Sequence, residues 1–168
     1  MPVSRVANSE TFHVSTPSDC EIRITRLFSA PRALVFEVFT NPELVKNWWG
    51  GNCDGYVMVA CEGDVRVGGK WRYANRTPTG FLAAFNGVYS EVTPPERLVF
   101  TEIFEMFPDS PSTVTVEFAE EKGKTRMTLM SVYPSVQVRD MVLQSGMEKG
   151  AALSYDRLEE IAETFGKK

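Results

Sequence analysis

The spacing of apolar residues changes once along the second half of this chain, and that change limits the folds open to it. From residue 56 to residue 132, apolar and polar side chains alternate over short segments, which is typical of β-strands. After Ser135 the apolar side chains recur every three or four residues, as on one face of a long helix. The members of this helical stripe are Leu143, Met147, Ala151, Tyr155, Leu158, Ala162 and Phe165. The pattern predicts an α+β protein in which one long helix covers an antiparallel sheet.

Turn residues divide the alternating part of the chain into consecutive strands. Gly68-Gly69, Pro78-Thr79-Gly80 and Thr93-Pro94-Pro95-Glu96 are strong turn sequences. Glu120–Lys124 (EEKGK) is typical of a hairpin loop, with Gly123 where a positive φ falls. We expect six or seven antiparallel strands, over residues 20–28, 56–61, 70–76, 81–92, 97–104, 113–118 and 125–132.

Two short helices are predicted between the first strand and the second. Pro31 suits the first turn of the first helix, because its missing N–H would have no partner there. The second helix begins at Pro42 and carries Trp48 and Trp49 before Gly50-Gly51 ends it.

Two glycines interrupt the C-terminal helical pattern. Gly146 and Gly150 each cost a helix about 1 kcal/mol relative to alanine. Their presence predicts a break near Ser145-Gly146, close backbone packing, or space left for another group. Ser135 is placed to cap the start of the helix.

Length and charge limit the organisation and the partners of the chain. Its 168 residues amount to one domain, which we place at residues 19–168, after a flexible lead-in or an edge strand in residues 1–18. A net charge of −4 argues against a nucleic-acid partner, because phosphate binding needs clustered positive charge. No apolar run reaches the ~18 residues of a membrane span. The first residues lack the apolar core of a signal peptide, so we expect a cytoplasmic protein.

The cysteines and the histidine argue against several kinds of site. Cys20, Cys53 and Cys61 are odd in number and form no CxxC pair, so neither a disulfide framework nor a thiolate zinc site is expected. We expect them to be buried apolar residues. His13, the sole histidine, lies in the polar N-terminal stretch, where it is poorly placed for a catalytic triad or a metal site. No metal or other cofactor is expected.

A helix lying across a curved sheet either packs solidly against it or leaves an internal space. Aromatic stripes more often form a solid core, but side chains of uneven size favour a space that suits a small molecule. The side chains expected to line such a space and to bind a hydrophobic ligand are Trp49, Trp71, Tyr73, Phe85, Phe100, Glu102, Phe104, Met127, Leu129, Met147, Ala151 and Tyr155.

Two of these residues are candidates for catalysis. Glu102 follows the period of Leu98, Phe100 and Phe104, so it should face inward with them. A carboxyl group there would have a raised pKa and could act as a general acid or base. The alternatives are a pair with an arginine or a strand end turned to solvent. Tyr155 could donate a hydrogen bond to a carbonyl or enolate, or could simply be an anchored core residue.

Four ordered segments of the chain carry a resemblance to a known family. They are SAPRALVFEVFTNPELVKNWWG (29–50), DVRVGGKWRY (64–73), GVYSEVTPPERLVFTE (87–102) and SGMEKGAALSYDRLEEI (145–161). Together they resemble the activator-of-heat-shock-chaperone-ATPase-like family of the START-like (SRPBCC) superfamily, over about residues 20–165. The resemblance implies the helix-grip fold, in which a curved antiparallel sheet wraps a long C-terminal helix around a hydrophobic cavity. It favours the internal space over the solid core.

Departures from that family bear on the shape of the space. Relatives often carry Gly-Trp and a leucine where this chain has Gly150-Ala151 and Tyr155. Gly51 stands where proline often follows Trp-Trp-Gly, which makes that loop less rigid. These departures predict an altered space without identifying its ligand.

Three functions remain open at this point. The first is non-catalytic binding of a small hydrophobic molecule, and the second is a cyclase, hydratase or isomerase that acts on a carbonyl compound through Glu102 and a tyrosine. The third is a chaperone-ATPase-activator-like interaction protein with a filled core. The eukaryotic activator has a separate chaperone-binding domain ahead of this fold, for which there is no room before residue 20, so a chaperone partner is not expected. A homodimer through an exposed edge strand is compatible with the sequence.

Overall fold

An antiparallel sheet with a long helix lying across it makes up the fold. The computed structural model describes residues 11–52 and 55–166. Within these residues eight strands form one sheet, in the order β1-β2-β8-β7-β6-β5-β4-β3. The strands are β1 Phe12–Ser15, β2 Glu21–Phe28, β3 Val57–Gly63, β4 Lys70–Arg76, β5 Leu82–Thr93, β6 Arg97–Phe104, β7 Ser112–Glu121 and β8 Lys124–Val132.

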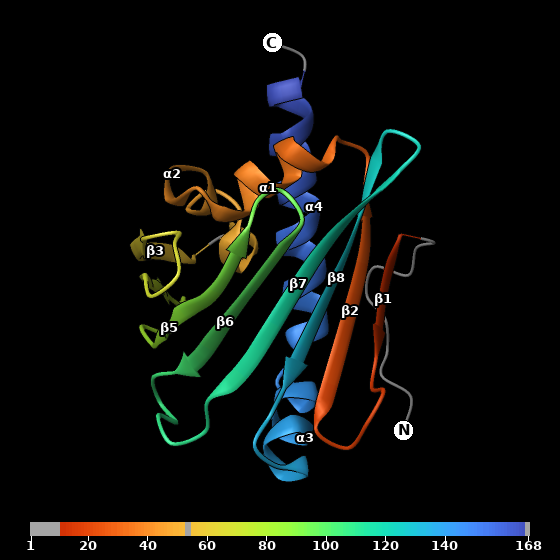
Figure 1. The fold of residues 1–168 in the computed structure, drawn as a ribbon. Helices are drawn as coiled ribbons and strands as arrows, with labels where there is room; N and C mark the ends of the chain where they lie inside the picture. Colours follow the sequence, from red (N-terminus) through yellow and green to blue (C-terminus); the bar gives the residue numbers. More distant parts are fainter. Residues whose placement is uncertain (1–10, 53–54, 167–168) are drawn as a thin grey trace.

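The long helix runs along one face of the sheet, as the helix-grip fold requires (Figure 1). The helical segments are α1 Arg32–Thr40, α2 Pro42–Val45, the 3-10 turn η1 Trp49–Asn52, α3 Val136–Gln144 and α4 Met147–Gly166. Figure 1 shows α1 near one end of α4 and α3 at the other. The predicted α+β fold is confirmed. None of the helices in the described part of the chain is long and apolar enough to cross a membrane.

The core lies between α4 and the inner face of the sheet. In β2, and in β7 as far as Phe118, every second side chain is buried, so each strand turns one face inward. Leu158 and Ala162 of α4 and Val35 and Val38 of α1 are fully buried against that face. Hydrophobic burial between the sheet and these two helices therefore holds the fold together.

The eighth strand, β1, lies in the stretch predicted to be a flexible lead-in or an edge strand. Its Phe12 and Val14 are buried and pair with β2, which explains why so short a segment joins the sheet. His13 lies on this strand with an exposed side chain, rather than in a tail. Residues 1–10 of the expected lead-in are outside the described residues.

The C-terminal helical pattern forms two helices rather than one, and of the alternatives open at the two glycines the structure shows a break at Ser145-Gly146. Gly146 has a φ of +87°, a conformation that glycine adopts without strain. The Ser135 side chain accepts a hydrogen bond from the Val138 N–H at 3.2 Å and caps α3, as predicted. The second short helix is shorter than predicted, because α2 ends at Val45 and Trp49 already belongs to η1.

Candidate functional site

The aromatic side chains of the interior form two clusters. The first, here called the closed cluster, consists of Phe28, Phe36, Phe39, Trp48, Phe118 and Tyr155. Its ring centroids are 5.5 Å apart for Phe39–Trp48 and 6.2 Å apart for Trp48–Tyr155. All of its members except Phe39 are buried, and Trp48 Nε1 donates a hydrogen bond to the Val38 carbonyl at 2.8 Å. This part of the interior is an ordinary packed core.

The second cluster spans η1 and strands β4 to β6, and we call it the β4–β6 cluster. Its members are Trp49, Trp71, Tyr73, Phe85, Tyr89, Phe100 and Phe104. Phe85 and Phe104 are stacked, with ring centroids 4.9 Å apart. The Trp71 and Phe100 rings meet edge to face at 5.6 Å. A continuous aromatic wall thus lines this part of the inner face.

Many inward-facing side chains on and opposite this wall keep part of their surface accessible. The half-buried ones are Trp49, Phe85, Glu102, Phe104, Leu129, Tyr133, Met147 and Ala151. Strand alternation and the stripe on α4 turn them towards the interior. A tightly packed core buries large apolar side chains almost completely, as the closed cluster does.

The structure divides the predicted ligand-binding residues between the two clusters. The aromatic residues that it brings together are Trp49, Trp71, Tyr73, Phe85, Phe100 and Phe104. Glu102 lies on the same face of β6, while Leu129 of β8 and Met147 and Ala151 of α4 face the same interior. Met127 and Tyr155 do not belong to this group, although the Tyr155 phenol lies near the Glu102 carboxyl group. Met127 is fully buried opposite Phe118, and Tyr155 packs on Phe28 and Trp48.

Glu102 is an ionisable side chain on the apolar inner face of β6. Burial raises the pKa of its carboxyl group to about 7. Within the described residues, no hydrogen bond or ion pair joins this carboxyl group to another side chain. Tyr133 and Tyr155 lie close enough to interact with it electrostatically. Burial first, and then the charge of Glu102, raise the pKa of both phenols, that of Tyr133 to about 12.

A glycine lies between Trp71 and Glu102 on this face. Trp71 pairs with Gly87 across β4 and β5, and the pairing of Asn86 with Ile103 puts Glu102 on the other side of Gly87. A Cβ added at Gly87 would lie 2.6 Å from Trp71 Nε1 and 1.7 Å from the Thr101 carbonyl oxygen. The indole therefore occupies the space that a side chain at this position would need.

The raised pKa of Glu102 predicts a pH-dependent stability. Between about pH 4.5 and pH 7 the folded protein holds a proton on Glu102 that the unfolded chain has released, so stability falls as pH rises through this window. The full loss amounts to roughly 3 kcal/mol. We expect Glu102→Gln to remove this decline and to be more stable than the native protein at pH 8, but not at pH 4.5. Urea unfolding at several pH values measures the free energy of unfolding of both proteins. Glu120→Gln, at an exposed position on β7, is the control. Parallel pH profiles for the native protein and Glu102→Gln would contradict the assignment.

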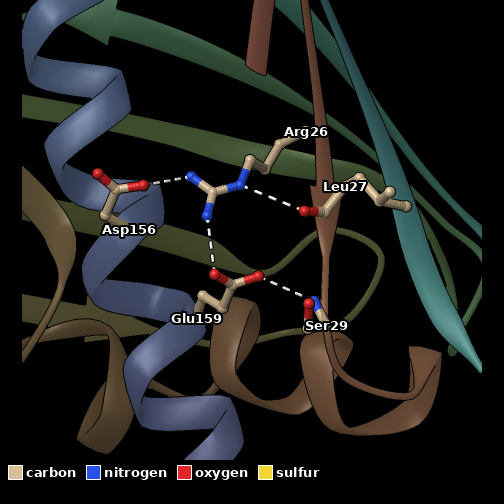
Figure 2. A network of polar contacts seen from close by, with 5 residues as sticks. All are labelled: Arg26, Leu27, Ser29, Asp156 and Glu159. Carbon is tan, nitrogen blue, oxygen red and sulfur yellow. Dashed lines mark hydrogen bonds and ion pairs between the residues drawn. The ribbon is translucent and has the colours of Figure 1, made fainter. Parts of the chain in front are cut away.

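A buried arginine on the inner face of β2 holds the sheet to α4 (Figure 2). The Arg26 side chain is 5% exposed and forms ion pairs with Asp156 Oδ1 at 2.6 Å and Glu159 Oε2 at 3.1 Å. Its guanidinium group also lies 5.2 Å from the centroid of the Phe28 ring. Glu159 accepts a second hydrogen bond, from the Ser29 N–H at 2.8 Å. The network fixes the position of α4 against β2 and the turn that follows it at Ser29.

Sequence reasoning did not single out Arg26 or Tyr133, although strand alternation contained the signal. Arg26 shares the period of Ile22, Ile24 and Phe28, and Tyr133 continues that of Ser131. Asp156 of α4 forms an ion pair with Arg26.

The opposite face of the sheet carries a half-open hollow of about 390 Å³. Its lining includes Glu62, Lys70, Arg72, Asn86 and Glu105, whose strand positions alternate with those of the inner face. Glu105 accepts hydrogen bonds from Arg72 at 2.8 and 3.0 Å and from Asn86 at 2.9 Å. Arg72, Asn86 and Glu105 therefore satisfy one another. The hollow also reaches Trp71 of the aromatic wall and the neighbouring Gly87.

The described residues provide no metal-ligand cluster for this site, and the described cysteines are free thiols. In the described part of the chain, no three His, Cys, Asp or Glu side chains lie together as metal ligands would. Cys20 and Cys61 are half-buried free thiols rather than fully buried residues, and burial raises the pKa of Cys61 to about 11. Cys53 lies outside the described residues.

Comparison with protein families and solved structures agrees with this architecture. The model of the family described as Activator of Hsp90 ATPase homolog 1-like protein matches residues 29–163. A structure from Rhodobacter sphaeroides is 22% identical and has a TM-score of 0.82, over 91% of this chain and 98% of that one. A structure from Nitrosomonas europaea is 24% identical with a TM-score of 0.79, over 91% of this chain and 100% of that one.

A third structure, protein Ms6760 from Mycobacterium smegmatis, is 25% identical with a TM-score of 0.78, over 91% of this chain and 98% of that one. Similarity at these levels shows that the fold is shared. No curated protein matches the chain.

Proposed function

The chain belongs to the Activator of Hsp90 ATPase homolog 1-like family, and on that premise we propose that it binds a small hydrophobic molecule between the β4–β6 cluster and α4. The observation that carries the proposal is the partial accessibility of large apolar side chains that face the interior. Concave, mostly apolar sites with a few polar groups are what small-molecule ligands need.

Glu102 supports the same proposal in a second way. Protein atoms surround its carboxyl group closely enough to raise its pKa to about 7, yet the residue is only half-buried. A side chain that borders an internal space has both properties at once. One polar group on an aromatic wall would orient a ligand that is otherwise held by apolar contact.

Ala151 gives the proposal a direct test, because it offers little volume where α4 faces the wall. It lies one helical turn before Tyr155 on the inner face of α4 and is half-buried. We expect Ala151→Trp to fold with a stability within about 1 kcal/mol of the native protein and to abolish binding of a hydrophobic probe such as 2-acetylnaphthalene. Thermal unfolding and calorimetric titration of the probe measure the two effects.

Leu153→Trp is the matched control for that experiment. Leu153 lies on the same helix with 37% of its surface exposed, so the added indole should leave probe binding unchanged. If the interior is instead solid, Ala151→Trp would overpack it and lose about 1–3 kcal/mol of stability. That loss, together with a native protein that binds no probe, would refute the proposed function.

Catalysis on a bound carbonyl compound is the second candidate function, favoured by the pKa of Glu102. A carboxyl group with a pKa of about 7 is suited to proton transfer near neutral pH. Tyr155 and Tyr133, both near that carboxyl group, are the phenols available to hydrogen-bond a ligand oxygen. An enzyme of the cyclase, hydratase or isomerase type would lose turnover in Glu102→Gln while keeping its affinity, whereas a binding protein has no turnover to lose.

A further inference from the structure

Two polar groups lack partners on the inner face beside Gly87. Trp71 is 4% exposed, and among the described residues its Nε1–H has no hydrogen-bond acceptor. Nor does the Glu102 carboxyl group on β6 make a hydrogen bond or an ion pair there. Leaving a buried donor or acceptor unsatisfied is unfavourable, so each such group needs an explanation.

The strand register brings these two groups to opposite sides of one glycine. Trp71 is the β4 partner of Gly87, and Glu102 lies next to Gly87 on β6. The Trp71 ring crosses β5 to meet Phe100, and its Nε1 lies 2.6 Å from where a Cβ at Gly87 would be. Because Gly87 carries no side chain, nothing from β5 stands between the indole N–H and the carboxyl group.

We propose that Trp71 Nε1–H and the Glu102 carboxyl group jointly bind the carbonyl oxygen of a neutral aromatic carbonyl compound. The rings of this compound would lie against the β4–β6 cluster, so the inference rests on the proposed function. A carbonyl oxygen has two lone pairs and accepts from both donors at once. The half-buried rings of Phe85 and Phe104, on the same faces of β5 and β6 as Gly87 and Glu102, offer the stacking surface for the ligand.

The surroundings of Glu102 favour its neutral, hydrogen-bond-donating form. Burial disfavours the carboxylate, and the nearby Tyr133 and Tyr155 phenols are uncharged at neutral pH, so neither supplies a positive charge that would favour it. A ligand carbonyl group is therefore complementary to this site, whereas a ligand carboxylate would add a charge to an apolar wall.

The test compares two ligands that differ only in whether one carbon is a carbonyl or a methylene group. The probes are 2-acetylnaphthalene and 2-ethylnaphthalene, titrated calorimetrically at pH 6 into the native protein, Trp71→Phe, Trp49→Phe and Glu102→Gln. We expect Trp71→Phe to weaken the ketone roughly five- to tenfold more than the hydrocarbon, because only the ketone loses a hydrogen bond. Trp49→Phe removes the same volume from the same cluster and should affect the two probes equally.

Glu102→Gln replaces the carboxyl group by an amide of similar shape, which donates a hydrogen bond but does not titrate. Its amide should hold the ketone about equally well at pH 6 and pH 8.5, whereas the native protein should bind the ketone more weakly at pH 8.5. Equal losses for ketone and hydrocarbon in Trp71→Phe would overturn this inference and leave the proposed function standing. Preference of the native protein for 1-(2-naphthyl)ethanol over the ketone would also overturn it. Failure of every naphthalene to bind would overturn both proposals.

Discussion

Gly87→Ala is expected to lose at least about 4 kcal/mol of folding free energy, the largest effect of any single substitution considered for this protein. The added methyl group would lie 1.7 Å from the Thr101 carbonyl oxygen and 2.6 Å from Trp71 Nε1. Neither neighbour can withdraw easily. The carbonyl belongs to the backbone of β6, and β5 is tied to that strand next to the glycine, where the Val88 N–H donates to Thr101 Oγ1 at 3.0 Å. The strands would have to separate.

Gly150→Ala is the matched control for this substitution. An added Cβ at Gly150 meets no atom within 4 Å, and the residue lies inside α4. We expect it to gain about 0.5–1 kcal/mol, since alanine favours a helix more than glycine does. Urea unfolding followed by circular dichroism gives both values. A loss below about 1 kcal/mol in Gly87→Ala would mean that β5 and β6 can shift there, and the close approach would not be a constraint.

Removing both acidic partners of Arg26 is expected to destabilise the protein more than removing the arginine itself. Arg26 is 5% exposed, whereas Asp156 and Glu159 are 52% and 24% exposed. The double variant Asp156→Asn/Glu159→Gln leaves a buried cation without a counter-charge, at a cost of about 3–5 kcal/mol. Arg26→Met leaves two carboxylates that water still reaches, and should cost about 1–2 kcal/mol.

The triple variant that combines these three changes tests the cause. If the uncompensated charge is responsible, adding Arg26→Met to the double variant should restore part of the lost free energy of unfolding. Equilibrium urea unfolding at low and high salt compares the native protein, Arg26→Met, the double variant and the triple variant. Additive losses of unfolding free energy, with no recovery in the triple variant, would show that these side chains stabilise the protein by packing and not by compensating the charge of Arg26.

Local sequence patterns predict the elements of this fold well, because each depends on neighbouring residues. The loop in EEKGK forms a turn in which Lys122 and Gly123 have φ values of +54° and +81°, as a two-residue hairpin requires. Gly146 breaks the C-terminal helix where its sequence predicted a break. β1 was harder to predict, since its four residues join the sheet only through pairing with β2.

The inward facing of these side chains was predictable from the sequence, but their position along the strand was not. Alternation correctly turns Phe100, Glu102 and Phe104 to the same side of β6. It cannot show that Met127 lies at the α1 end of β8, because that depends on its register with Phe118. Arg26 illustrates the opposite case, in which a charged residue at an inward position looks unfavourable until α4 supplies its carboxylates.

The position of α4 at the end of the element order has a consequence for biosynthesis. All eight strands precede this helix in the chain, and β2 pairs with β8 across most of the sequence. During translation, therefore, the apolar inner face of the sheet is made long before the helix that covers it. Such long-range pairing is slow and leaves apolar surface open to other chains. A nascent chain that has not reached Met147 has the whole aromatic wall but no helix to cover it.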